Sequence, residues 1–314
     1  MNKLAVVAFG GNALLKSNQK GTISEQEANI YETCSHLIDL IKAGYDIVIG
    51  HGNGPQVGNV LLQHEAGEKT FGIPKLPIDV CVAETQGSIG YMIEQQLRNV
   101  LYKEDMERDI ITIITQVLVD KNDQAFKNPT KPIGPYYSKE ESLQLAKDKG
   151  DVFAEDPRGR GYRKVVASPR PVRINNRKTI EKIARDGQIV VTVGGGGIPV
   201  HYVDGKRLEG IDAVIDKDLA SSLLASQIRA DEFYILTDVA KVYIHYNTPQ
   251  QKELNRITVK EAKQFLQEGH FSEGSMAPKV RAAIEFIENG GKRCIITQAS
   301  DLGKSDCGTR IVLN

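Results

Sequence analysis

The chain opens on the run Leu4-Ala5-Val6-Val7-Ala8-Phe9, and Gly10-Gly11-Asn12 follows at once. Six consecutive apolar residues predict a strand that is buried on both faces. The two glycines let backbone N–H groups approach a ligand, because no Cβ stands in the way. A glycine pair alone fits a plain tight turn equally well, but two similar turns later in the chain favour an anion-binding loop.

Those two turns also follow apolar strands. Asp46-Ile47-Val48-Ile49 leads into His51-Gly52-Asn53-Gly54-Pro55, and Ile189–Val193 leads into Gly194–Gly197. Strands that alternate with helices predict an α/β fold with a parallel sheet, whose ligands gather at the carboxyl ends of the strands. We therefore expect the loops at Gly10 and Gly52 to share one edge. His51 beside its turn is interpreted as a structural histidine.

Other elements follow from periodicity and turn residues. They are a helix over 24–41 with a capping box at Ser24–Glu27, a long helix over 79–102 containing Gly87 and Gly90, a strand over 110–119, hairpins near 201–208 and 242–244, and a capping box at Thr258–Glu261. In residues 120–171 few apolar residues recur with the period of a helix or of a strand. We therefore predict that this segment is an excursion from the main sheet, which forms a small protruding subdomain or lid.

Composition limits the classes of function. Among 314 residues, 40 basic residues balance 40 acidic ones, which gives no overall attraction for nucleic acid or a membrane. The N-terminus lacks a signal-peptide pattern, so we expect a cytoplasmic protein. The four cysteines form no CxxC pair, and we interpret them as buried thiols rather than as metal ligands or a disulfide framework: Cys34, Cys81, Cys294 and Cys307.

Three lysines lie at informative places. Lys217 and Lys279 lie at the starts of predicted helices, and Lys131 stands between two prolines in the excursion. A lysine in a first helical turn opposes the helix dipole, so a bound anion or an acidic neighbour is expected there, although a solvated lysine is the plain alternative. Glycine turns, several cations and Asp216 together fit phosphoryl transfer from a nucleotide with Mg²⁺. An anionic acceptor would need no general base.

The chain resembles the carbamate kinases of the amino-acid kinase family, over essentially its whole length. The resemblance rests on Gly10–Leu14, His51–Gly58, Asn128–Pro135, Ala213–Asp218 and Gly269–Val280. It implies a three-layer αβα sandwich with an open, mainly parallel central sheet and a small protruding subdomain. Residues 1–200 would form the carbamate and phosphoryl lobe, with the lid at about 120–171, and residues 201–314 the nucleotide lobe.

The resemblance also implies reversible phosphoryl transfer between ATP and carbamate, by a homodimer that needs Mg²⁺. The reaction would run toward ATP in arginine and carbamoyl phosphate catabolism. Lys217 and Lys279 would hold the transferring phosphoryl group, Asp216 would orient those lysines and weakly support Mg²⁺, and Lys131 would reach the carbamate. The remaining implied residues are Gly10, Gly11, Asn12, Gly52, Asn53 and Gly54 for the phosphoryl site, and Asp238, Val239, Tyr243 and Met276 for the nucleotide.

Three alternatives stay open. A kinase of another small carboxylate would share the fold, but the Lys131 segment argues against it. A non-catalytic nucleotide sensor would not need all of the lysines. The excursion could instead be a protein-docking arm, in which case deleting Asn122–Pro169 would spare activity.

Overall fold

One large sheet lies at the centre of the fold, which is described by a computed structural model over residues 2–16, 19–156, 159–304 and 306–314. Its strands are β1 (Leu4–Phe9), β2 (Asp46–His51), β3 (Ile110–Thr112), β9 (Ile189–Val191), β12 (Glu232–Leu236), β15 (Arg256–Thr258), β16 (Arg293–Thr297) and β17 (Thr309–Val312). Their order is β15-β17-β16-β12-β1-β2-β9-β3. Neighbouring strands are parallel except β16 and β17. The mainly parallel sheet is thus confirmed.

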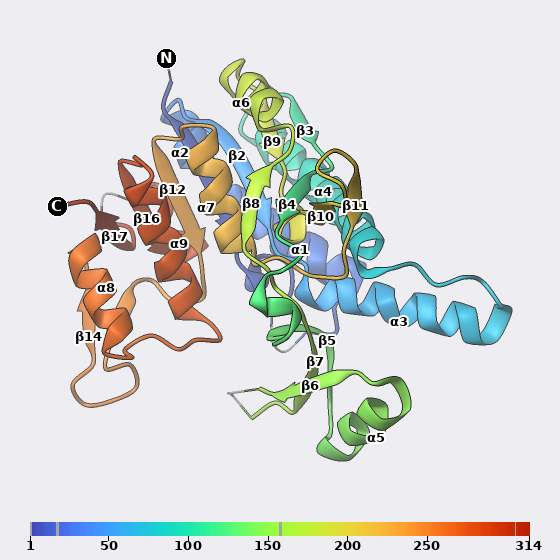
Figure 1. Cartoon of the computed structure of the whole chain (residues 1–314). Helices are drawn as coiled ribbons and strands as arrows, with labels where there is room; N and C mark the ends of the chain where they lie inside the picture. Colours follow the sequence, from blue (N-terminus) through green and yellow to red (C-terminus); the bar gives the residue numbers. More distant parts are fainter. Residues whose placement is uncertain (1, 17–18, 157–158, 305) are drawn as a thin grey trace.

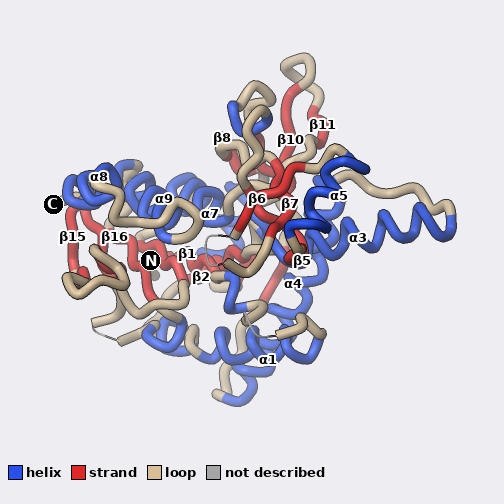
Figure 2. Tube along the Cα trace, turned by 90° about the horizontal axis from the view of Figure 1, so that it is seen from below, coloured by secondary structure: helices blue, strands red, loops and turns tan. Residues whose placement is uncertain are grey.

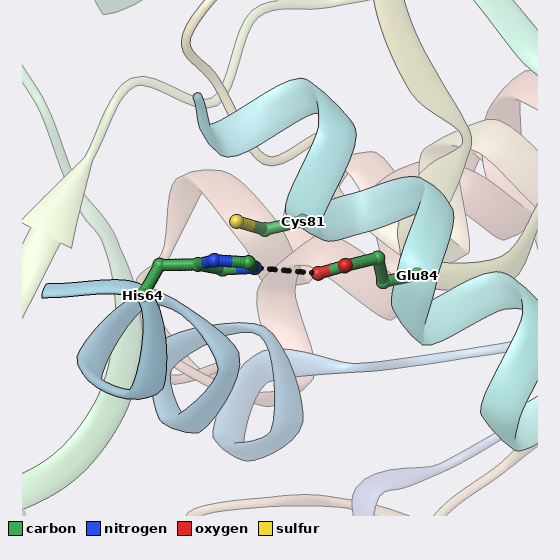
Figure 3. Close-up of side chains that lie close together, drawn as sticks. All are labelled: His64, Cys81 and Glu84. Atoms are coloured by element: carbon green, nitrogen blue, oxygen red, sulfur yellow. Dashed lines mark hydrogen bonds and ion pairs between the residues drawn. The ribbon is translucent and has the colours of Figure 1, made fainter. Parts of the chain in front are cut away.

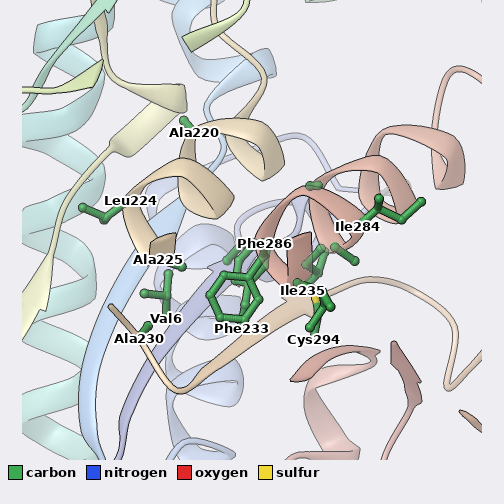
Figure 4. Close-up of a cluster of buried hydrophobic side chains, with 14 of the residues drawn as sticks. Val6, Ala220, Leu224, Ala225, Ala230, Phe233, Ile235, Ile284, Phe286 and Cys294 are labelled. Atoms are coloured by element: carbon green, nitrogen blue, oxygen red, sulfur yellow. The ribbon is translucent and has the colours of Figure 1, made fainter. Parts of the chain in front are cut away.

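Strand β1 lies in the interior of this sheet and is buried along its whole length. Its alternate residues enter two different cores, with Leu4 in one and Ala5 in the other. The first core also contains Phe233 and Phe286, whose rings meet edge-on with centroids 5.6 Å apart (Figure 4). The expected strand buried on both faces is therefore confirmed.

Helices cover both faces of the sheet (Figures 1 and 2). The first core lies under α6 (Arg177–Arg185), α7 (Lys217–Gln227), α8 (Val259–Gln267) and α9 (Met276–Glu288). The second core lies under α1 (Ile23–Ser35), α2 (Ile38–Lys42) and α4 (Ile78–Lys103). This arrangement is the expected three-layer αβα sandwich.

Two smaller sheets lie outside the central one, and the predicted subdomain over 120–171 contributes mainly to the second. One contains β4 (Gln116–Val119), β8 (Pro171–Ile174), β10 (Ile198–Tyr202) and β11 (Leu208–Gly210). The other contains β5 (Lys131–Tyr137), β6 (Val152–Glu155) and β7 (Tyr162–Val166), and with α5 (Lys139–Lys149) it protrudes below the main body in Figure 1. The expected hairpins are present as β10–β11 and as β13 (Val242–Ile244) with β14 (Lys252–Leu254).

The strand expected over 110–119 is wrong as a single element, because β3 and β4 belong to different sheets. The chain changes sheet around Thr115, where the buried Gln86 binds the backbone. Its Oε1 accepts the Thr115 N–H at 2.8 Å, and its Nε2 donates to the Thr115 carbonyl at 3.2 Å. The Thr115 carbonyl also accepts the Ile198 N–H of β10 at 2.8 Å, so a side chain distant in sequence supports the backbone where the chain passes from one sheet to the other.

The first helix also begins differently from the expectation. The capping box joins Thr22 to Glu25 rather than starting at Ser24, and the predicted helix over 24–41 is interrupted between α1 and α2. The capping box at Thr258 and Glu261 is confirmed.

The long helix expected over 79–102 is confirmed as α4. A Cβ on its Gly90 would lie 2.3 Å from the Thr112 side chain, so this glycine allows α4 to pack on β3. Neither α4 nor any other helix of the described residues is long and apolar enough to cross a membrane.

Candidate functional site

Three glycine turns meet at one edge of the large sheet. Strand β1 pairs with β2, and β2 pairs with β9, so the turns that follow these strands are neighbours, as expected for the first two. The first turn packs closely on the strand beside it, because a Cβ on Gly10 would lie 2.5 Å from the Leu236 carbonyl oxygen. A Cβ on Gly11 would meet only open space. The side chain of Asn12 lies outside the described part of the structure.

The third glycine turn, at Gly194–Gly197, packs closely against the second, at Gly52–Gly54. A Cβ on Gly195 would lie 2.2 Å from the Asn53 amide nitrogen, and Gly195 has a φ of +63°, which a larger residue adopts only with strain. The Asn53 amide is buried and donates to Thr85 Oγ1 at 2.9 Å. These contacts fix the loop around Gly52 and Gly54.

Two of the three predicted lysines share one carboxylate. Lys217 Nζ donates to Asp218 Oδ1 at 2.5 Å, and Lys279 Nζ donates to Asp218 Oδ2 at 2.9 Å. The Asp218 side chain is only 3% exposed, and Lys217 also packs against the second loop, because a Cβ on Gly52 would lie 3.2 Å from its Cδ. The acidic neighbour expected for the lysines is therefore Asp218, which the sequence reasoning missed.

The third lysine reaches the same place from the protruding sheet. Lys131 Nζ donates to Asp216 Oδ2 at 2.7 Å. The other oxygen of Asp216 caps α7 by accepting the N–H groups of Asp218 and Leu219. In this structure Asp216 contacts Lys131, whereas Asp218 contacts Lys217 and Lys279, the two lysines that the resemblance assigned to Asp216.

Burial and charge shape the ionisation of this cluster. Burial alone would raise the pKa of Asp216, but the ammonium of Lys131 outweighs it and holds that pKa well below its usual value. The pKa of Asp218 is lowered in the same way by Lys217 and Lys279. Burial lowers the pKa of Lys217, against the opposing charge of Asp218. In Lys279 the carboxylates outweigh burial and raise the pKa.

This cluster carries a net positive charge. Three ammonium groups face two carboxylates, and the four carboxylate oxygens each accept a described hydrogen bond. An incoming phosphoryl group would therefore supply negative charge that the cluster lacks, and each ammonium group has further N–H donors to offer it.

The protruding sheet also brings an arginine to the second glycine loop. A Cβ on Gly54 would lie 3.6 Å from the Pro132 carbonyl oxygen and 3.9 Å from Arg163 Nη2. Arg163 Nε donates to the Gly134 carbonyl at 2.9 Å, and its guanidinium lies over the Tyr136 ring at 5.4 Å. Among the described residues its buried Nη2 has no hydrogen-bond partner. In the sequence Arg163 is one of several basic residues between Arg160 and Lys164, and nothing there distinguishes it from its neighbours.

The four residues expected at the nucleotide are not gathered as tightly. Asp238 follows β12, and its charge contributes to raising the pKa of Lys279. Met276 begins α9 and packs partly buried on the first core. Val239 follows Asp238 in the loop before β13, whereas Tyr243 lies on the β13–β14 hairpin against Tyr246, with ring centroids 6.0 Å apart.

His51 is buried under the third glycine turn, and this environment disfavours a second proton on its ring. Its Nδ1 lies 3.0 Å from the Gly52 carbonyl, so Nδ1 carries the hydrogen, and a Cβ on Gly194 would lie 2.4 Å from its Nε2. Burial lowers the pKa of His51 from 6.5 to about 4, with help from the nearby charge of Lys217. The structural reading of His51 fits this environment better than a role as general base.

Because its pKa is lowered in the folded chain, His51 should make the free energy of unfolding depend on pH. The unfolded chain takes up a proton at His51 near its ordinary pKa and the folded chain does not, so stability should fall as pH drops from about 6.5 toward about 4. The loss attributable to this group should be on the order of 3 kcal/mol. Urea unfolding at several pH values should show a shallower loss in His51→Gln, while His36→Gln should keep the wild-type slope. Equal slopes for His51→Gln and wild type would contradict this.

Comparisons with known proteins agree with this geometry. Residues 3–298 match the model of the amino acid kinase family. A carbamate kinase of Pyrococcus furiosus is 48% identical over 99% of this chain and 100% of its own length. Carbamate kinase 1 of Enterococcus faecium is 47% identical over 99% and 98%.

Solved structures give the same result. Carbamate kinase from Giardia lamblia bound to citric acid has a TM-score of 0.94 and 42% identity, over 100% of this chain and 99% of that chain. The same enzyme bound to AMP-PNP has a TM-score of 0.90 and 43% identity over the same shares. The chain therefore belongs to the amino acid kinase family, and within it to the carbamate kinases.

Proposed function

We propose that this chain transfers a phosphoryl group reversibly between carbamoyl phosphate and ADP, giving carbamate and ATP. The observation that carries the proposal is the Lys131–Asp216 contact, which places a lysine of the protruding sheet beside Lys217 and Lys279. Both substrates are anions, and three convergent ammonium groups reduce their mutual repulsion. The Giardia carbamate kinase structure with AMP-PNP supports an ATP-type nucleotide for this chain.

In the ATP-forming direction, a terminal phosphate oxygen of ADP attacks the phosphorus of carbamoyl phosphate. The P–O bond to the carbamoyl group breaks, and carbamate leaves as an anion. No proton has to be removed from the nucleophile, which agrees with the buried, neutral His51. In this proposal Lys217 and Lys279 hold the transferring phosphoryl group, and Lys131 leaves Asp216 for the carbamoyl end.

The backbone of the glycine turns is proposed to line the same site. Gly10 and Gly11 would face the phosphoryl group from β1, and Gly52 with Gly54 from β2, where N–H groups at a turn and a helix start suit an anion. Asn12 and Asn53 are proposed to belong to the same phosphoryl site as these glycines. The proposed division keeps these loops in residues 1–200 and the nucleotide in residues 201–314.

The nucleotide is proposed to lie over the C-terminal part of the site. Asp238, Val239, Tyr243 and Met276 remain the assigned residues, and the position of Asp238 near Lys279 supports this placement. Mg²⁺ would neutralise charge on the nucleotide phosphates. Because both oxygens of Asp216 already accept hydrogen bonds, we propose that the phosphates hold the ion and that Asp216 supports it indirectly.

The test is ATP formation from ADP and carbamoyl phosphate with Mg²⁺, with acetyl phosphate measured in parallel. We expect turnover with carbamoyl phosphate and a much lower kcat/KM with acetyl phosphate. Preference for acetyl phosphate would favour a kinase of another small carboxylate. Binding of ADP without turnover of either compound would favour a nucleotide sensor.

Arg163 provides a prediction about the lid. Its unpartnered Nη2 near Gly54 is placed to donate to the bound substrate, and a hydrogen bond to a charged group contributes about 1.5–3 kcal/mol. Arg163→Gln should therefore raise the KM for carbamoyl phosphate by about tenfold or more, with a smaller change in kcat. Arg173→Gln is the matched control, because Arg173 also stacks on a tyrosine, Tyr202, but outside the lid. An unchanged KM in Arg163→Gln would contradict the assignment.

We also propose a homodimer in the cytoplasm. Apolar side chains are exposed on α4 and beside the edge strand β3, among them Tyr91, Ile111 and Ile114. A Cβ on Gly87 of α4 would meet only open space, which leaves room for close approach of a second helix. Light scattering coupled to size exclusion should give twice the chain mass. A single chain mass would contradict this.

A further inference from the structure

A second group of polar side chains lies between α3 (Gly54–Phe71) and α4. His64 projects from α3, and Cys81 and Glu84 project from α4 into the same space (Figure 3). His64 Nε2 and Glu84 Oε2 are 3.0 Å apart, and the ligand atoms of the three residues all lie within 4.8 Å of one another. None of these residues belongs to the lysine site.

The three donors form a set suited to a borderline transition metal. A thiolate, an imidazole nitrogen and a carboxylate oxygen together favour Zn²⁺ over Mg²⁺ or Ca²⁺, which prefer oxygen ligands alone. In a tetrahedral zinc site such donors lie about 3.5 Å from one another. The nitrogen of His64 and the oxygen of Glu84 are already 3.0 Å apart, and no separation within the set exceeds 4.8 Å, so a small movement would bring the donors to that distance. His64 and Glu84 are partly exposed and have room to rotate, whereas Cys81 is buried.

The surroundings favour a cation at this place. Burial and then the charges of Glu84, Asp79 and Asp212 raise the pKa of the Cys81 thiol to about 11. Asp212 is held near the start of α4, where its Oδ1 accepts the Ile78 N–H at 2.9 Å. The thiol itself makes only a weak contact, with Sγ 3.7 Å from the Leu76 carbonyl oxygen. A bound metal would replace that contact and neutralise the surplus negative charge.

We propose that His64, Cys81 and Glu84 form a zinc-binding site that ties α3 to α4, with its fourth position open to water. Binding displaces the thiol proton of Cys81 to solvent and forms a sulfur–zinc bond. The ion stabilises the contact between the two helices, and α3 begins at Gly54 of the second glycine loop. Zinc is four-coordinate, so three protein ligands leave one position for a water molecule.

The experiment uses the full chain freed of metal by a chelator and dialysed. Titration with ZnCl₂ in a calorimeter should give one site per chain, and titration with CoCl₂ should give the near-ultraviolet absorption of a thiolate–cobalt bond. Zinc should also raise the melting temperature, because it binds only the folded arrangement. We expect His64→Gln to weaken zinc binding about tenfold or more, and Cys81→Ser to abolish the cobalt–thiolate band.

The controls are His36→Gln and Cys307→Ser, which remove a histidine and a cysteine outside the cluster. Both should bind zinc and cobalt as the wild type does. Circular dichroism of each metal-free variant distinguishes a lost ligand from a lost fold, and Cys81→Ala serves where Cys81→Ser fails to fold. Absence of the cobalt–thiolate band in the wild type would overturn the proposal. Zinc binding that is unchanged in both His64→Gln and folded Cys81 variants would also overturn it.

Discussion

Replacing Lys217 with alanine should lower the kcat for ATP formation by on the order of a hundredfold or more. Lys217 is the lysine fixed most completely in the site. Its Nζ is held by Asp218 and its stem packs on Gly52, at the point where the second glycine loop meets α7. A cation fixed in advance beside the transferring phosphoryl group stabilises the charge of the transition state without reorganising, and alanine removes it.

The expected loss is therefore mainly in kcat rather than in the KM for ADP. Lys263→Ala is the matched control: Lys263 on α8 forms an ion pair with Glu288 on the surface, so its loss should leave turnover unchanged. A coupled assay of ATP formation measures both variants. Wild-type turnover in Lys217→Ala would remove this lysine from the mechanism.

Asp218→Asn should damage both activity and stability. One carboxylate that is almost fully buried holds two ammonium groups, so its neutralisation leaves both lysines without their main partner. Breaking a buried ion pair costs about 3–5 kcal/mol, and we expect a loss of free energy of unfolding of that order. Turnover should fall by about a hundredfold, because the lysines lose the positions in which Asp218 holds them.

A shift in pH dependence would separate this effect from simple unfolding. The charge of Asp218 raises the pKa of both Lys217 and Lys279, while burial lowers it. Without that charge the lysines lose their protons at lower pH, so the alkaline fall in rate should begin at lower pH in Asp218→Asn than in wild type. Glu288→Gln, which breaks only a surface pair, should keep both the stability and the profile. An unshifted profile in folded Asp218→Asn would contradict the role.

Much of the fold followed from β1 and the turn after it. A strand apolar at every position has to be covered on both faces, and Leu4 and Ala5 do enter separate cores. The alternation with helices then places the Gly10 and Gly52 loops at one edge. The strand over 110–119 could not be divided from its own residues, because the backbone at the break is bonded to Gln86, a residue distant in sequence.

The three lysines of the candidate site could be predicted from the sequence, but the aspartate that each lysine contacts could not be predicted as well. Lys131 lies far from Asp216 in sequence, and only the folded protruding sheet brings the two to 2.7 Å. Asp218 was open to prediction, since two aspartates flank Lys217 at the start of one helix and only one of them can cap it. His64 and Cys81 could not be connected, because their meeting depends on how α3 packs on α4.

The central claim is that Lys217 and Lys279, held in place by Asp218, bind the transferring group, while Lys131 leaves Asp216 for the carbamoyl end. A crystal structure with ADP, Mg²⁺ and an unreactive analogue of carbamoyl phosphate tests it most directly. The account predicts that Lys217 and Lys279 lie within hydrogen-bond distance of the phosphoryl mimic, and that Lys131 has moved from Asp216 to the carbamoyl end. An analogue bound elsewhere, with the Lys131–Asp216 contact unchanged, would contradict it.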